Sequence, residues 1–373
     1  MTIKIDPPAL VDFQEVTLDS LRDLASTPGP TVSVFMDTYP HGPDTLIGRK
    51  QLARLIPVIE AELRDLGLSK QDAAAFTQPL RNLADSVTLW KQMDEGLALF
   101  VTPTNTVGFR LAYDPHVSYT VGDIPRLHPV VRELDHSEEF YVFAVAQDDV
   151  RLLKCTANSV ERVKDTTLPD SFAEELMRND DNRKSKITAG GGGRGRQVFR
   201  GDGADPGSTA ELNRQLKNIG VELRKTLGPN EDRIIVAATL PSYLPALRDG
   251  ANYGSFAEEI VSGSHGNLSD KQLQELALPI AAHEREKGRL ADRDEIEAMA
   301  AHDRAVVGVE DIALLEEGRV RTLKVSEPTF RGTEEDKVEV SPTDELIVET
   351  LRHRGDVIHN DKLDAKAVAL LRY

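Results

Sequence analysis

The chain has 373 residues, a formal net charge of -17 and 40% hydrophobic residues, which predicts two or three domains with buried cores. Its single cysteine, Cys155, excludes a disulfide framework and a cysteine-based zinc site. The N-terminus lacks a signal-peptide pattern and no apolar stretch reaches membrane-span length, so we expect a cytoplasmic protein without a membrane partner. Because an acidic chain repels nucleic acid on average, any RNA binding must be local, and we expect no DNA partner.

The first region, residues 1–135, has the apolar spacing of an α/β domain. Its pattern predicts, in chain order, a helix at 18–24, a strand at 32–36, helices at 46–66 and 72–87, strands at 96–102 and 107–113, and a helix at 127–134. We expect a domain boundary near residue 135.

The middle region, residues 136–266, alternates strands and helices around a basic loop at 183–207. The pattern predicts a hairpin of strands at 140–146 and 150–155, a third strand at 159–163, a helix at 171–177, a helix at 208–227, a strand at 233–238 and a helix at 242–248. Ser208 and Glu211 have the spacing of a capping box at the start of the long helix. This order predicts an α/β sandwich.

The third region, residues 267–373, predicts another small α/β domain. We expect helices at 270–299 and 309–318, a strand at 319–325, an acidic surface loop at 326–342, a helix at 343–355, a strand at 356–359 and a closing helix at 364–373. The chain as a whole is therefore expected to be α/β (α+β) with three domains.

The segment from residue 183 to 200, RKSKITAGGGGRGRQVFR, has an unusual composition within this acidic chain. It contains no acidic residue and six basic ones: Arg183, Lys184, Lys186, Arg194, Arg196 and Arg200. Glycines such as Gly195 allow close backbone approach, arginine suits phosphate, and Gln197 adds a neutral amide. We predict a loop that reaches into RNA and presents Gln197. The alternative is a surface loop without fixed structure.

Other motifs do not indicate a cofactor or a metal. Residues 190–195 match GxGxxG, but no apolar strand precedes them and no helix follows directly, which excludes a dinucleotide site. No Lys-Ser/Thr pair follows the glycines, which excludes a Walker A loop. Four residues near the end of the chain do not have the spacing of a common metal site: His353, Asp356, His359 and Asp361. We therefore expect no cofactor and no metal.

The order of hairpin, basic glycine loop, long helix and apolar strand RIIVAA resembles the bacterial relatives of the archaeal and eukaryotic class-1 peptide chain release factor. EDIALLEEGRVRTLKV, SVFMDTYP and DEGLALFVTP extend the resemblance over most of the chain. It implies a ribonuclease-H-like middle domain and a C-terminal domain like ribosomal proteins that bind kink-turn RNA. Gln197 and Gly195 match the catalytic Gly-Gly-Gln, although Arg196 replaces its second glycine. The stop-codon motif Asn-Ile-Lys-Ser is absent from residues 1–130.

This resemblance implies a translation factor that occupies the A site of idle or stalled ribosomes, in hibernation or rescue, without reading stop codons. Its partners would be rRNA and tRNA, and a translation GTPase such as elongation factor Tu is a candidate for delivering it. Two alternatives stay open. Gln197 could orient water to hydrolyse peptidyl-tRNA, or the glycine loop could serve an enzyme acting on a small phosphorylated ligand.

Overall fold

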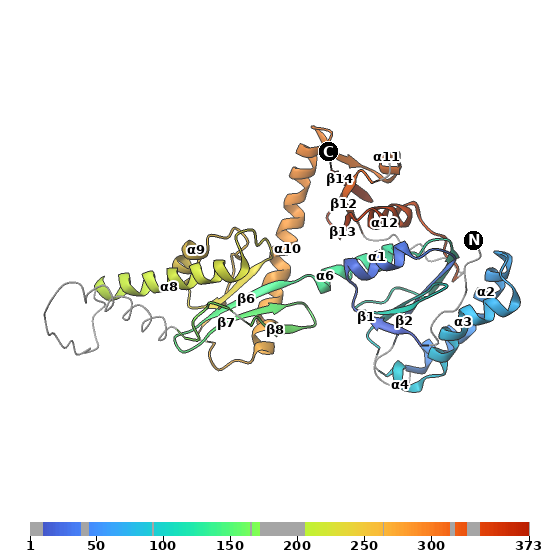
Figure 1. The fold of residues 1–373 in the computed structure, drawn as a ribbon, viewed down its shortest axis with the longest axis horizontal. Coiled ribbons are helices and arrows are strands. Elements are labelled where there is room, and N and C mark those ends of the chain that lie inside the picture. The colour runs from blue at the N-terminus through green and yellow to red at the C-terminus, as the bar shows by residue number, and fades with distance from the viewer. Residues whose placement is uncertain are drawn as a thin grey trace. The chain divides into compact units, whose positions relative to one another are not determined.

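The computed structural model describes residues 10–38, 45–91, 93–164, 166–171, 206–263, 265–313, 318–326 and 336–372. These residues form a mixed α/β structure with three sheets, which confirms the predicted fold class (Figure 1). Its internal contacts define two compact units. Unit 1 comprises residues 1–137 and 289–373, and unit 2 comprises residues 138–288.

The first sheet of unit 1 has the strand order β1-β4-β3-β2-β5. Its elements are β1 (Asp12–Gln14), α1 (Leu18–Ser26), β2 (Thr31–Asp37), α2 (Thr45–Asp65), α3 (Lys70–Asp85), α4 (Val87–Trp90), β3 (Gly96–Val101), β4 (Thr106–Leu111), β5 (Ser118–Gly122), α5 (His128–Val131) and α6 (Leu134–Ser137). Because side chains alternate along β2, Val34 packs with Leu52 and Phe76 from α2 and α3, whereas Phe35 packs on the opposite face.

The second sheet of unit 1 has the order β11-β14-β12-β13. Its elements are β11 (Ala305–Val307), α11 (Val309–Ala313), β12 (Val320–Val325), α12 (Pro342–Arg352), β13 (Asp356–His359) and β14 (Ala367–Leu371). The helix predicted at 364–373 is wrong, because β14 is an interior strand with all five residues buried. A short continuous apolar run is compatible with either structure, and here two neighbouring strands decide the outcome.

The two sheets of unit 1 share one hydrophobic core. Leu21 and Leu24 of α1 belong to the same buried cluster as Ile347 and Leu351 of α12. The expected three-domain division implied separate cores for the first and third predicted regions. In the structure, residues of both regions belong to one core.

The 336–338 segment also joins the two parts of unit 1, because it pairs with the edge strand β5. The Tyr119 N–H donates to the Asp336 carbonyl at 2.7 Å, and the Val338 N–H donates to the Tyr119 carbonyl at 2.9 Å. Residues 327–335 of the acidic surface loop expected at 326–342 lie outside the described residues, and the described part adds an isolated bridge to Tyr119 at Lys337. The acidic composition suggested exposure, but it does not reveal a backbone pairing to a distant strand.

Unit 2 contains a five-stranded sheet with the order β10-β9-β6-β7-β8. Its elements are β6 (Phe140–Val145), β7 (Val150–Cys155), β8 (Val160–Arg162), α8 (Pro206–Leu227), β9 (Ile235–Thr239), α9 (Leu244–Ala251), β10 (Val261–Ser262) and the part of α10 (Asp270–Ala300) up to residue 288. Strand β9 is parallel to β6 and β10, whereas β7 is antiparallel to β6 and β8.

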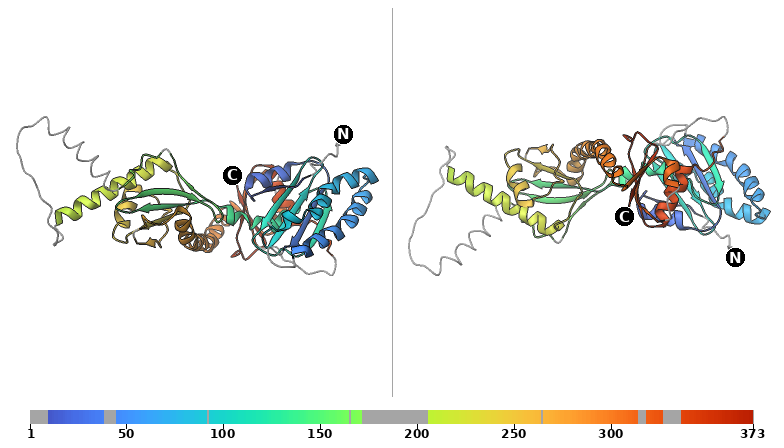
Figure 2. Two further views of the ribbon diagram at one scale, coloured as in Figure 1. Left: turned by 90° about the horizontal axis from the view of Figure 1, so that it is seen from below. Right: turned by 90° about the horizontal axis from the view of Figure 1, so that it is seen from above.

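The faces of this sheet are covered by different helices. Phe143 packs in one cluster with Leu216 of α8 and Leu247 of α9, and Val142 packs in another with Leu273 of α10. Figure 2 shows α8 and α10 on opposite faces of the sheet. The predicted third domain began at residue 267, but the first half of α10 contributes to the core of unit 2. Spacing alone located the helix correctly without showing which core it joins.

Candidate functional site

The predicted site residues lie outside the residues that the structure describes. They are Arg183, Lys184, Lys186, Arg194, Gly195, Arg196, Gln197 and Arg200. The helix predicted at 171–177 falls almost entirely in the same part of the chain. What the structure shows is the framework on either side of residues 172–205.

The framework before this segment is attached to β7 and to α8. The Val150 N–H donates to the Asp170 carbonyl at 3.0 Å, and the Thr167 hydroxyl donates to the Glu222 carbonyl of α8 at 3.5 Å. Leu168 is buried in the core beneath α8. These contacts fix residues 167–170 against β7 and α8.

The framework after this segment is helix α8, which is fixed by its own apolar stripe and by close packing on α9. A Cβ atom at Gly220 would overlap the Leu247 carbonyl oxygen, and one at Gly250 would overlap the Lys217 carbonyl oxygen. Only glycine permits this approach, so the two helices cross with their backbones nearly in contact.

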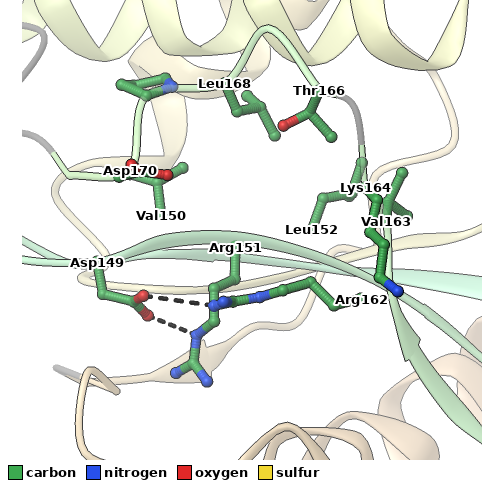
Figure 3. Close-up of a pocket in the computed structure, with 11 residues that line it drawn as sticks. Asp149, Val150, Arg151, Leu152, Arg162, Val163, Lys164, Thr166, Leu168 and Asp170 are labelled. Atoms are coloured by element: carbon green, nitrogen blue, oxygen red, sulfur yellow. Dashed lines mark ion pairs between the residues drawn. The ribbon is translucent and has the colours of Figure 1, made fainter.

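A cavity of about 490 Å³ lies between β7, β8 and the segment at 166–170. Figure 3 shows Thr166, Leu168 and Asp170 on one side of this cavity and Asp149, Arg151 and Arg162 on the other. Lys164 lies at its end, beyond β8 (Figure 3). We call this the β7–β8 cavity.

The guanidinium of Arg151 is a structural part of the cavity wall, because its nitrogen atoms all have partners. Its Nε lies 2.5 Å from Asp149 Oδ2 and its Nη1 lies 2.7 Å from Asp270 Oδ1. Nη1 and Nη2 also donate to the Leu268 and His265 carbonyls, each at 3.0 Å. Through these carbonyls, residues 265–268 are tied to β7.

The remaining cations of the cavity are more accessible. The Arg162 side chain is 51% exposed and lies 3.6 Å from Asp149 Oδ1. Lys164 is exposed, and within the described part of the chain it has no ion-pair partner. Neither residue is among the site residues predicted from the sequence. Their cavity forms only because residues 166–170 return to β7, and local spacing does not encode that return.

The shifted pKa values of unit 2 do not indicate a proton-transfer site. Partial burial of Glu139 opposes its ionisation, but hydrogen bonds from Lys154 and Arg233 hold its pKa below the ordinary value. Burial raises the pKa of the Cys155 thiol to about 12, and the charge of Asp270 adds to this effect. Glu139 is therefore ionised and Cys155 is protonated at neutral pH.

The described residues contain no cluster of three or more potential metal ligands, and no described helix is both long and apolar enough to cross a membrane. The four residues considered for a metal site have separate ion-pair partners. His353 pairs with Glu349, Asp356 with Arg22, His359 with Asp135, and Asp361 with Arg289 and Lys362.

Residues 140–283 match the model of bacterial archaeo-eukaryotic release factor family 7. This match covers the sheet of unit 2, the whole basic segment and helix α8. The middle of the chain is therefore release-factor-like, which confirms the resemblance predicted from its motif order. No curated protein matches the chain.

Three solved structures of archaeal and yeast proteins also align with this chain. An archaeal translation termination factor, aRF1, is 14% identical with a TM-score of 0.23, over 96% of this chain and all of that chain. Archaeal Pelota, from a model of ribosome-bound Pelota and ABCE1, is 12% identical with a TM-score of 0.36, over 96% and 94%. S. cerevisiae Dom34 is 14% identical with a TM-score of 0.34, over 64% and 65%. Scores this low do not establish a common function.

Proposed function

We propose that this protein is a ribosome-associated translation factor that occupies the A site of idle or stalled ribosomes without reading stop codons. The observation that carries the proposal is the basic, glycine-rich segment at 183–200 inside the residues that match a release-factor-like family. In this proposal the segment extends toward the tRNA acceptor end, and its arginines contact RNA phosphates.

The charge distribution supports a local contact with RNA. The chain carries a net charge of -17, so its overall field opposes association with RNA, whereas the segment at 183–200 has no acidic residue. In unit 2, residues 167–170 are held by β7 and α8, and α8 itself begins at Pro206, after residues 172–205. A fixed base with a basic segment suits insertion into a confined RNA site.

Peptidyl-tRNA hydrolysis by Gln197 is a second candidate function, and the position of this glutamine in the basic segment favours it. A glutamine amide cannot abstract a proton but can orient water and stabilise a developing oxyanion. Arg196 precedes it where the family's motif has glycine. If that position requires a positive φ angle, arginine adopts it at an energetic cost, which favours occupation of the site without hydrolysis.

Co-sedimentation with purified bacterial ribosomes tests the proposal. The proteins to compare are wild type, Gln197→Ala, a triple variant with Arg194, Arg196 and Arg200 changed to alanine, and a control with the exposed residues Lys50, Lys70 and Lys91 changed to alanine. We expect wild type, Gln197→Ala and the control to sediment, and the arginine variant to remain in solution as salt is raised.

Two results would contradict the proposal. Wild type that stays in solution at low salt, with both vacant and stalled ribosomes, would remove direct ribosome binding. Equal loss in the arginine variant and the lysine control would show that charge alone matters. A peptidyl-tRNA release assay then separates the two candidate functions, because only hydrolysis requires Gln197.

A further inference from the structure

The second sheet of unit 1 brings arginines from all four of its strands to one end. Strands β11, β12 and β13 run in one direction and β14 runs in the other, so the starts of the first three strands and the end of β14 lie together. Just outside these ends lie four arginines, one for each strand: Arg304, Arg319, Arg354 and Arg372. We call these four residues, together with Arg321, the arginine edge.

Backbone hydrogen bonds hold the arginine edge together. The Leu371 N–H donates to the Arg304 carbonyl at 2.9 Å. The Arg372 N–H donates to the Arg319 carbonyl at 3.0 Å. Because adjacent strands lie about 4.8 Å apart, the row from β11 to β13 is about 14 Å wide. The row is therefore longer than a single phosphate group.

Arg321 joins this edge through a β-bulge. The pairing of β12 with β14 shifts by one residue between Val320 and Thr322, which leaves Arg321 as the extra residue. Its carbonyl oxygen lies 3.1 Å from the point where a Cβ atom on Gly355 would be, directly after Arg354. A bulge can re-aim a side chain, and the side chain of Arg321 is exposed.

Three arginines of the edge are exposed and have no partner in the protein. Among the arginine side chains that the structure describes, only these three make no hydrogen bond, ion pair or aromatic contact: Arg304, Arg321 and Arg354. Every other described arginine has such a contact. The three are therefore gathered at one end of one sheet and are not scattered over the surface.

Few acidic residues lie next to these arginines. Asp356 pairs with Arg22 at 2.8 Å, and Asp303 is exposed beside Arg304. The two glutamates at 316–317 lie outside the described residues. The described part of the edge is thus positive in a chain with a net charge of -17.

Arg354 occupies a backbone position that favours glycine. Helix α12 ends at Arg352, and Arg354 has a φ angle of 56°, in the left-handed region. Glycine is the usual residue just after a helix in this conformation, because it has no Cβ atom. The chain therefore carries a cation where backbone preference alone favours glycine.

We propose that the arginine edge binds the phosphate backbone of RNA, with Arg304, Arg321 and Arg354 each contacting a separate phosphate. A guanidinium group can form two hydrogen bonds to one phosphate. A row about 14 Å wide fits a chain of repeated phosphates better than one small anion. This contact belongs to unit 1 and adds to the basic segment at 183–200, which belongs to unit 2. That the RNA is ribosomal rests on the proposed function.

Fluorescence anisotropy of the full chain with a labelled single-stranded RNA tests the contact. The edge variant combines Arg304→Gln, Arg321→Gln and Arg354→Gln. The matched control removes the same charge from exposed lysines elsewhere in unit 1, through Lys50→Gln, Lys70→Gln and Lys91→Gln. We expect the edge variant to bind at least about ten-fold more weakly than wild type, with a salt dependence of log K less steep by about 2. The control should keep the wild-type salt dependence.

The single substitution Arg354→Gly separates RNA binding from stability. Because glycine prefers the left-handed conformation at this position, we expect this variant to unfold at a higher urea concentration than wild type. Its salt dependence of log K should nevertheless become less steep by about 0.7, since one phosphate contact is lost. Weaker binding by a more stable variant cannot result from unfolding.

Three results would overturn the RNA contact. The first is a wild-type protein that binds no RNA at low salt. The second is an edge variant that binds RNA as well as the lysine control does, with the same salt dependence. The third is an edge variant that no longer sediments with ribosomes but still binds RNA, which would indicate an acidic protein as the partner. Failure of the wild type to sediment with ribosomes, while its edge still binds RNA, would remove only the proposed function.

Discussion

His128 is a buried imidazole at the start of α5, held between the two sheets of unit 1. Its Nε2 lies 2.7 Å from the Ser326 carbonyl, and its backbone N–H donates to Asp344 at 2.8 Å. Burial lowers the pKa of His128 below the ordinary value, although the Ser326 carbonyl and Asp344 oppose this shift; Arg126 and His359 add to the lowering. The folded protein therefore favours the neutral imidazole.

This lowered pKa makes stability depend on pH in a defined direction. Because the unfolded histidine titrates near about pH 6.5, the stabilisation is complete above that pH and is lost as pH falls through the lower pKa of the folded state. His128→Gln keeps a side-chain N–H donor but does not titrate. We expect its free energy of unfolding to fall less from neutral to acidic pH than that of wild type. Urea denaturation at pH 7.5 and 5.5 measures the difference.

The matched control for this prediction is His283→Gln, because His283 is half exposed on α10. This variant controls for the loss of an imidazole from an exposed site. An unaltered pH dependence in His128→Gln would show that other groups cause the acid sensitivity of the fold.

Close packing of α8 on α9 fixes the position of α8, the helix that follows residues 172–205. Alanine normally favours a helix over glycine by about 1 kcal/mol, but at Gly220 or Gly250 its Cβ would overlap a backbone carbonyl. Backbone atoms cannot move aside as a flexible side chain can, so overlap should dominate. We expect Gly220→Ala and Gly250→Ala each to destabilise unit 2 by about 1–3 kcal/mol in urea unfolding.

Gly288→Ala is the control for the helix crossing. Gly288 is exposed on α10 with open space around its Cβ position, so alanine there should stabilise by up to about 1 kcal/mol. If all three substitutions were stabilising, the close approach of α8 and α9 would be contradicted.

The pairing of the 336–338 segment with β5 is a second element-level feature that can be tested. Val338→Pro removes the N–H that donates to the Tyr119 carbonyl, which should lower the unfolding free energy by about 1–3 kcal/mol. Glu339→Pro is the comparison, because within the described residues the Glu339 N–H has no hydrogen-bond acceptor. Equal stability of the two variants in chemical denaturation would argue against this pairing.

At the scale of the whole molecule, unit 2 is one continuous stretch of chain, whereas unit 1 combines two separate stretches. We expect only unit 2 to fold as a single isolated fragment. Residues 138–288 contain both cores of unit 2, so we expect this fragment to unfold cooperatively by itself. Residues 1–137 lack the partners of Leu21 and Leu24 from α12 and should bind a hydrophobic dye until residues 289–373 are added. Cooperative unfolding of residues 1–137 without dye binding would contradict a shared core.

Much of the fold could be predicted from the sequence because many elements have clear periodic patterns. The apolar stripe of α8, with Leu212, Leu216, Ile219 and Leu223, indicates both the helix and its buried face. The strands β2, β6, β7 and β9 are compact apolar runs, and the sequence pattern predicts all four. The resemblance of motif order located the release-factor-like region.

Features that depend on distant residues could not be predicted in this way. Strand β14 gives a continuous apolar pattern that also suits a helix, and only pairing with β11 and β12 decides it. The cations Arg162 and Lys164 are common residue types at unremarkable spacing, and their cavity requires the return of residues 166–170 to β7. In both cases the deciding contacts join parts of the chain that local periodicity treats separately.

The shared core of unit 1 has a consequence for how the protein is made. Translation adds roughly 5–20 residues per second, and α1 emerges long before α12 and β14. The apolar side chains around Leu21 and Phe35 are therefore synthesised on the order of tens of seconds before the α12 and β14 residues that share their core. Unit 2 is completed during that interval from a single uninterrupted stretch. The order of folding thus differs from the order of synthesis. The apolar side chains of the first sheet stay exposed longest on the nascent chain, so chaperones have the most time to bind there.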